Sequence, residues 1–288
     1  MDSIALDVVI KGYKEHCLEE WNELVKDSQR FDLMNDEIVI FKGDRFHFSN
    51  TYREEQVSAW LAWILRLETI SEKEQSQLSN KLINNLFSKA FQNDSEGMKD
   101  IINFKPLNIE TEIPCRYFDD EKNDFSDGRL DLIIEDEERI IVIENKIGDM
   151  SIQKNLYYYK ALVEKYKGKK KLITILLIRK DDLKYITEEK KDNGSLEYFK
   201  PIIWEDFCLN FRKILDETPI VIEDNKIKDK GLLLWITQAQ SFLSCVEAQV
   251  LNFNFFAIEK LIEGKPCNQV NIIEQAKRYI EYRKEKKQ

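Results

Sequence analysis

The sequence is poor in the residues that build thiolate or imidazole metal sites. Its 288 residues include only two histidines, His16 and His47, and five cysteines without a CxxC pair. The cysteines are widely spaced: Cys17, Cys115, Cys208, Cys245 and Cys267. A zinc site and a disulfide framework are therefore both disfavoured, and we expect a reducing, cytoplasmic location.

Long hydrophobic runs are also lacking. The N-terminus has no basic region followed by an apolar one, so no secretory signal is expected. The most apolar stretch, Leu232 to Val250, is interrupted by Gln238, Gln240 and Glu247. This pattern indicates a buried helix rather than a membrane span, and no membrane partner is expected.

Glycine and proline are scarce as well, with nine and five residues, which disfavours a chain of linked modules. A net charge of −9 disfavours a protein that grips long nucleic acid with its whole surface, but a local basic patch can still meet phosphate. Two segments are candidates, and a solvated loop and a frayed helix end are the alternative interpretations. They are Lys165, Lys167, Lys169, Lys170 and Lys171, and the tail Lys277, Arg278, Arg283, Lys284, Lys286 and Lys287.

The order of hydrophobic patterns predicts the fold class. Helical spacing marks residues 4–28, 51–65, 72–92, 148–166, 204–215, 228–263 and 270–286; strand patterns mark 109–115, 129–135, 139–146, 172–178 and 202–203. A short hairpin is expected in 36–48 and a polar turn over 119–127. We predict an α/β fold with a mixed central sheet flanked by helices and extra helices at both termini. The expected division is an N-terminal extension (1–50), a core (51–218) and a C-terminal helical region (219–288).

Three charged residues interrupt or end the strongest strand patterns. Asp131 stands between Leu130 and Leu132, while Glu144 and Lys146 follow the apolar run 140–143. Charges in such positions need partners, and metal binding or mutual pairing are the usual reasons. A purely structural Asp131–Lys146 ion pair is the alternative.

This set of side chains suits the hydrolysis of a phosphodiester. Two carboxylates on neighbouring strands can hold Mg²⁺ or Mn²⁺, which activates water and stabilises charge on phosphate. Side chains alternate along a strand, so Glu144 and Lys146 point to one face, where the ammonium group can orient the attacking water. Asn145 points to the opposite face and is expected to pack or to cap the strand end.

A second pattern follows on the next predicted helix. Gln153 and Tyr157 are four residues apart and therefore share one side of that helix. Gln153 can support Lys146 or contact a nucleic-acid backbone, and Tyr157 can donate a hydrogen bond to phosphate. The same spacing also occurs by chance.

Taken together, Gly128-Arg129-Leu130-Asp131, Ile143-Glu144-Asn145-Lys146, and Gln153 with Tyr157 resemble the PD-(D/E)XK nuclease superfamily. The QxxxY pattern resembles the branch of bacterial recombination and lambda-type exonuclease domains. The resemblance covers residues 50–215 and implies a restriction-endonuclease-like core. It implies Asp131 and Glu144 as metal ligands and Lys146 as the catalytic lysine. Leu130 stands where many members have proline.

The helix Arg53 to Leu65 resembles the N-terminal helix of a bacterial subgroup, in which an acid lies beside the metal. By its distance from Ser58, Glu54 aligns best with that acid, and Glu55 is the second choice. A capping box from Thr51 to Glu54, or an exposed glutamate, is the alternative. Glu112 is a further acid, although its alternation with Glu110 also fits an exposed strand.

The expected function is a metal-dependent deoxyribonuclease, in defence or repair, with DNA favoured over RNA. A catalytically silent nuclease-like binding or scaffold protein is the alternative. No GxxxxGK[ST] pattern is present, so any ATP-driven motor would be a partner chain. A homodimer or another protein partner stays open.

Overall fold

The computed structural model describes residues 15–26, 54–70, 72–120, 122–147, 152–188, 194–218, 222–223, 226–227, 229–253, 257–258, 260–261, 264 and 266–284. The predicted hairpin in 36–48 and Thr51 lie outside these residues. The chain forms two compact units. One comprises residues 50–246; the other comprises 1–49 and 247–288 and includes a helix over 15–26 and helix α12 (Val270–Lys284). The division into three segments that the sequence predicts stays a prediction.

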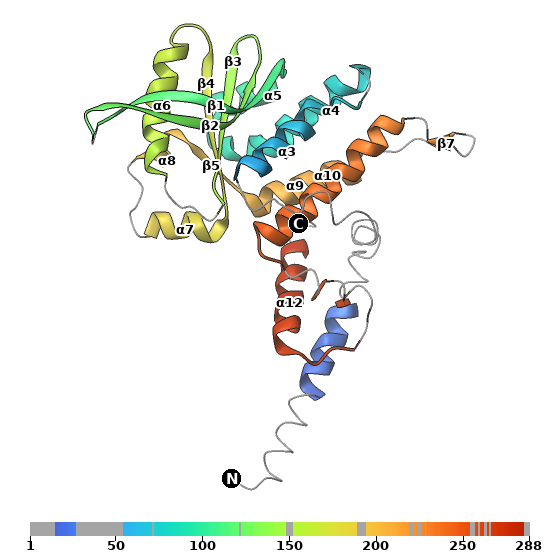
Figure 1. The fold of residues 1–288 in the computed structure, drawn as a ribbon. Coiled ribbons are helices and arrows are strands. Elements are labelled where there is room, and N and C mark those ends of the chain that lie inside the picture. Colours follow the sequence, from blue (N-terminus) through green and yellow to red (C-terminus); the bar gives the residue numbers. More distant parts are fainter. Residues whose placement is uncertain are drawn as a thin grey trace, which may run out of the picture. The chain divides into compact units, whose positions relative to one another are not determined.

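A mixed five-stranded sheet forms the centre of the 50–246 unit (Figure 1). Its strands lie in the order β1 (Asn108–Asp119), β2 (Asp124–Glu135), β3 (Arg139–Asn145), β4 (Lys171–Ile178) and β5 (Lys200–Ile203). The pairs β1–β2 and β2–β3 are antiparallel, and β3–β4 and β4–β5 are parallel. The predicted α/β, restriction-endonuclease-like class is confirmed.

Helices cover the sheet because β3 and β4 are apolar on both faces. Helix α6 (Gln153–Tyr166) packs on one face against a core that includes Ile133, Val142 and Leu176 (Figure 1). Helix α3 (Glu54–Arg66) contacts β1 and β2, and α9 (Trp204–Asp216) packs on α4 (Glu72–Phe87). The other elements are a 3₁₀ helix (Ser88–Phe91), α5 (Ser95–Ile102), α7 (Lys180–Glu188), α8 (Ser195–Tyr198), the hairpin β6 (Ile222–Glu223) and β7 (Lys226–Ile227), and α10 (Lys230–Gln249). None of the helices in the described part of the chain is long and apolar enough to cross a bilayer.

Helix α10 fixes the C-terminal end of α3. The indole Nε1 of Trp235 donates a hydrogen bond of 2.9 Å to the carbonyl oxygen of Ile64. Gly231 lies so close to the carbonyl oxygen of Thr69 that a Cβ atom there would collide with it. Helix α10 therefore positions α3, and Glu54 lies at the N-terminal end of α3.

The β1–β2 ribbon is longer than the sequence predicts. We expected a polar turn over 119–127, but β1 runs to Asp119 and β2 begins at Asp124, so this expectation was wrong for most of the segment. Phe118 and Phe125 pair across the ribbon near its tip, with ring centroids 5.4 Å apart, and such cross-strand aromatic pairs stabilise strands. Pairing between β2 and β3 covers only Leu132 to Glu135, so the ribbon separates from β3 beyond that point.

Candidate active site

The point where β2 separates from β3 places two carboxylates side by side. The last paired residues are Leu132 and Ile143, and the next residue on each strand is Asp131 and Glu144, respectively. Asp131 Oδ2 accepts a hydrogen bond of 2.7 Å from the backbone N–H of Asn145. A side chain thus replaces the missing ladder bond and keeps the two strand ends together.

Burial makes both carboxylates costly. Glu144 is only 2% exposed, and its Oε1 atom has no hydrogen-bond partner in the structure. Burial, followed by the charge of Asp131, holds the pKa of Glu144 well above its usual range. Burial also raises the pKa of Asp131 to about 6, although the Asn145 N–H and the charge of Lys146 oppose the rise. A bound cation would stabilise the ionised form of both buried carboxyl groups.

Lys146 lies beside these acids and is held by α3. Its Nζ atom is 3.8 Å from Oε2 of Glu54, and its side chain is 12% exposed. Oε1 of Glu54 accepts a hydrogen bond of 2.8 Å from the backbone N–H of Ile147. The Glu54 carboxylate therefore reaches the end of β3, whereas Glu55 pairs with Arg129 at 3.0 Å.

Asn145, between Glu144 and Lys146, faces the other way, as strand alternation predicts. Its Oδ1 atom accepts a hydrogen bond of 3.1 Å from Nε1 of Trp204, and its Nδ2 atom donates one of 3.4 Å to the carbonyl oxygen of Glu54. Asn145 thus joins α9 and α3 to the end of β3. It contributes to the geometry of the site although it does not face the acids.

Helix α6 brings a different tyrosine to the site from the one we predicted. Tyr158 lines the cleft, while Tyr157 stacks on Tyr117 with centroids 5.7 Å apart and does not line it. Gln153 is the first residue of α6, but its side chain lies outside the described residues. The roles of Gln153 and Tyr157 stay predictions.

Two further α6 residues line the cleft and were missed from the sequence. Lys154 is exposed, whereas Asn155 is only 1% exposed and its Nδ2 atom has no hydrogen-bond partner. The sequence does contain a pattern that could have predicted Lys154: it lies four residues before Tyr158, so the two side chains share one face of the helix.

The cleft has a volume of about 770 Å³, and Glu54, Asp131, Glu144, Lys146 and Tyr158 are among the residues that line it. No group of three or more ligating side chains placed to hold a metal ion was found in the described parts of the chain. The chemistry of the site nevertheless fits a hard divalent cation, because Asp131 and Glu144 offer oxygen ligands and Oε1 of Glu144 is buried without a partner. Asp131 and Glu144 would hold such an ion.

Comparison with protein families identifies the superfamily of the chain. The family model described as PD-(D/E)XK nuclease superfamily matches residues 44–233. The chain belongs to the PD-(D/E)XK nuclease superfamily. The match spans the whole sheet and α3, and so includes every residue of the cleft. Comparisons with curated proteins and with solved structures give no match.

Proposed function

We propose that this PD-(D/E)XK protein is a nuclease that uses Mg²⁺ or Mn²⁺ to hydrolyse phosphodiester bonds in DNA. The observation that carries the proposal is the partnerless Oε1 atom of Glu144, buried beside Asp131 near the end of β3 and two residues before Lys146. Burying a carboxylate with one oxygen unsatisfied costs stability, and cation binding offsets that cost. A role in defence or repair is part of the same proposal.

The side chains divide the chemistry between them. A cation held by Asp131 and Glu144 supplies Lewis-acid stabilisation of the phosphate and acidifies water. Lys146 orients the attacking water through its ammonium group and stabilises negative charge that develops on the phosphate. Glu54 holds Lys146 in place through the 3.8 Å contact and ties the following residue through Ile147 N–H.

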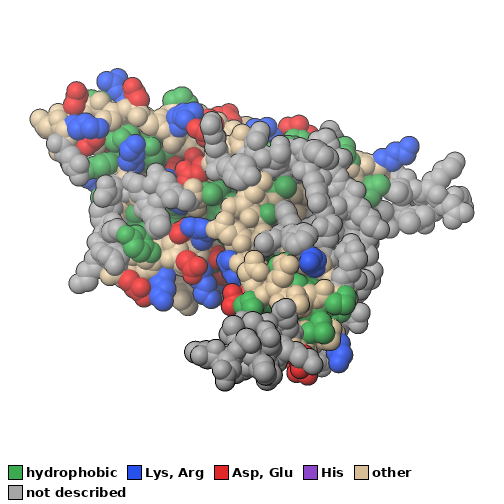
Figure 2. Space-filling model, turned by 60° about the horizontal axis from the view of Figure 1, so that its bottom comes forward, with side chains coloured by type: hydrophobic (Ala, Val, Ile, Leu, Met, Phe, Trp, Pro, Cys, Tyr) green, Lys and Arg blue, Asp and Glu red, His purple; other side chains and the backbone are tan. Residues whose placement is uncertain are grey.

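Surface charge limits how the substrate is held. On the face shown in Figure 2, described acidic and basic side chains are intermixed rather than gathered by sign. Two lysines of the predicted basic segment are engaged by acids: Lys170 pairs with Glu135 at 3.3 Å, and Lys171 with Asp100 at 2.7 Å. We therefore expect the protein to contact the DNA backbone only close to the cleft, where Lys154 lies, and not along an extended basic surface.

Cleavage assays with linear, circular and single-stranded DNA in Mg²⁺ or Mn²⁺ test this proposal. We expect metal-dependent cutting by the wild-type protein and a loss of about 10²–10³-fold in rate for Lys146→Ala, typical of a lost charge-stabilising group. Lys105→Ala is the matched control, because Lys105 is an exposed lysine outside this cleft and should leave the rate unchanged.

Equal cutting by Lys146→Ala and wild type would contradict the catalytic role of the lysine. If the wild-type protein cuts no substrate and calorimetry detects no Mn²⁺ binding, the chain is a nuclease-like binding or scaffold protein instead. The preferred DNA topology separates exonuclease from endonuclease activity.

A further inference from the structure

A third acid from the sheet enters the cleft. Thr111 and Ile113 pair with Leu132 and Leu130, which places Glu112 opposite Asp131 across the ribbon. Glu112 lines the same cleft as Asp131 and Glu144. Glu112 is therefore near both residues that we assign to the cation.

The backbone at Glu112 is unusual for a strand. Its φ angle is +55°, in the left-handed region that residues other than glycine adopt only rarely and at a cost. The ladder resumes on both sides without a change of register, so the irregularity is confined to this residue. Strained residues of this kind cluster at functional sites, where the surrounding fold supports them.

The two oxygens of Glu112 have different environments. Oε2 lies 3.0 Å from Nη1 of Arg129, while Oε1 is buried and has no hydrogen-bond partner. The nearby Glu144 repeats this feature with its own partnerless Oε1 at 2% exposure. Two acids of one cleft, on two strands, thus each present a buried carboxylate oxygen that no protein donor satisfies.

We propose that Glu112 turns from Arg129 and becomes a third carboxylate ligand when Asp131 and Glu144 hold a divalent cation. In the cation-free arrangement of the described residues, the three acids are not yet placed as a ligand group. The inference rests on the proposed function and extends it to a residue on β1. Magnesium and manganese take oxygen ligands, and affinity rises with the number of carboxylates that a site supplies. A site with three strand carboxylates is more anionic than the pair alone and retains the cation more tightly.

Arg129 is the competing cation in the metal-free protein. Its guanidinium group bridges Glu55 and Glu112, both at 3.0 Å, and its side chain is 59% exposed. Exposed ion pairs of this kind contribute little stability, so a divalent cation can displace Arg129 from Glu112. Arg129→Gln should therefore strengthen the binding of Mn²⁺ to the otherwise wild-type protein.

Calorimetric titration of the full chain with Mn²⁺, without nucleic acid, tests the proposal. We expect Glu112→Gln to weaken Mn²⁺ binding about tenfold or more, within the range for lost metal-site partners. Glu110→Gln is the matched control: it removes the same charge two residues away on the same strand, where Glu110 is exposed and outside the cleft. Its affinity should match that of the wild type.

Two further variants separate a ligand from a structural acid. Glu112→Gly removes the carboxylate but suits the positive φ angle, so it should melt at or above the wild-type temperature and still lose affinity for Mn²⁺. In the double variant Arg129→Gln/Glu112→Gln the affinity should stay low. A return to wild-type affinity would show that Glu112 acts only by neutralising Arg129, and would overturn the proposal.

The remaining outcomes distinguish this inference from the proposed function. If wild type and Glu112→Gln bind Mn²⁺ equally, Glu112 is not a ligand, although the metal-dependent nuclease stands. If the wild-type protein binds no Mn²⁺, both are overturned.

Discussion

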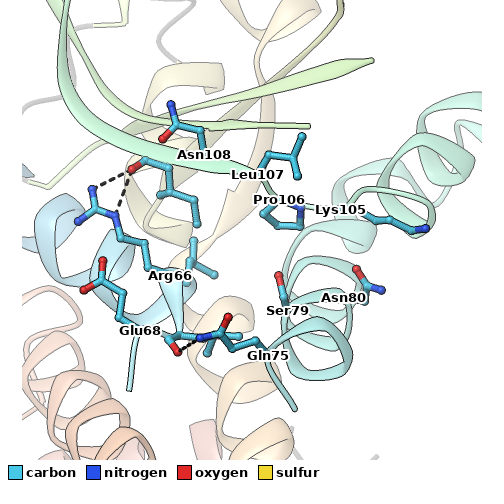
Figure 3. A pocket seen from close by; sticks show the side chains of 12 residues that line it. Arg66, Glu68, Gln75, Ser79, Asn80, Lys105, Pro106, Leu107 and Asn108 are labelled. Carbon is cyan, nitrogen blue, oxygen red and sulfur yellow. Dashed lines mark hydrogen bonds between the residues drawn. The ribbon is translucent and has the colours of Figure 1, made fainter. Parts of the chain in front are cut away.

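Two clefts of similar size share α3 and β1 but differ in how their polar groups are satisfied. The candidate active site has about 770 Å³ and lies at Glu54 and Glu112, and a second cleft of about 680 Å³ lies at Arg66 and Ile109 (Figure 3). In the second cleft, Nε and Nη2 of Arg66 donate to the Ile109 carbonyl oxygen at 3.1 and 2.8 Å. Gln75 donates to backbone carbonyl oxygens at 3.0 and 2.8 Å.

The difference lies in what each cleft leaves unpaired. In the second cleft, Arg66 bonds to a backbone oxygen of β1 and so ties α3 to the sheet, while Gln75 bonds to the carbonyl oxygens of Leu67 and Ile70 and so holds the turn after α3. In the first cleft, Glu112 and Glu144 each have a buried oxygen without a partner. Volume therefore does not distinguish the two, whereas the unsatisfied buried acids do.

The largest change in stability is expected when an acid of the first cleft is neutralised. Asp131 has a pKa of about 6 in the folded protein, against 3.8 ordinarily, so the folded state binds the proton more tightly. Protonated Asp131 therefore favours the folded state most at a pH below its unfolded pKa of 3.8. This contribution to stability is lost as the pH rises through 6. A pKa raised from 3.8 to about 6 corresponds to about 3 kcal/mol of stability. In metal-free buffer, Asp131→Asn should be more stable than wild type by up to that amount at pH 7.

Denaturant unfolding of both proteins in EDTA at pH 4 and pH 7 measures this effect. At pH 4 the gain should fall to a small fraction of its value at pH 7, because folded Asp131 is then protonated and the unfolded carboxyl, with a pKa of 3.8, is only about half ionised. Glu68→Gln in the second cleft is the control, because Glu68 is exposed and its replacement should change stability by no more than about 0.5 kcal/mol. A variant that is less stable than wild type at pH 7 would show that the buried charge is already compensated.

A smaller effect is expected where the first cleft meets α6. A Cβ atom at Gly128 would come closest to the hydroxyl of Tyr158, with two ring carbons at 2.7 and 2.9 Å. Tyr158 is 6% exposed and cannot move aside freely, so Gly128→Ala should cost about 2 kcal/mol of unfolding free energy.

Denaturant unfolding measures that cost. Adding Tyr158→Phe removes the atom nearest the new methyl group, and should restore part of the lost stability. If Gly128→Ala is as stable as wild type, the tyrosine is not confined as the structure has it.

The sequence predicts the β3 end of the site well because strand periodicity is simple there. An apolar run followed by Glu144-Asn145-Lys146 places the outer two residues on one face and Asn145 on the other, as the structure has them. The helix is harder. Three consecutive tyrosines, 157–159, do not show which side of the helix is buried. Successive residues of a helix point about 100° apart, so an error of one position selects the wrong tyrosine. Glu112 could not be assigned because period-two alternation does not describe a residue with a φ angle of +55°.

The smallest effect belongs to the second cleft, where Arg66→Ala should cost about 1 kcal/mol of stability through two lost hydrogen bonds. DNA cleavage should stay within about twofold of wild type, because Arg66 lies twelve residues along α3 from Glu54, about 18 Å at the helical rise. Parallel unfolding and cleavage measurements separate the two effects, with Lys99→Ala as the control because Lys99 is exposed and lines neither cleft. A tenfold loss of cleavage without a loss of stability would instead mean that the second cleft binds substrate, because the guanidinium would then be needed for something other than holding Ile109.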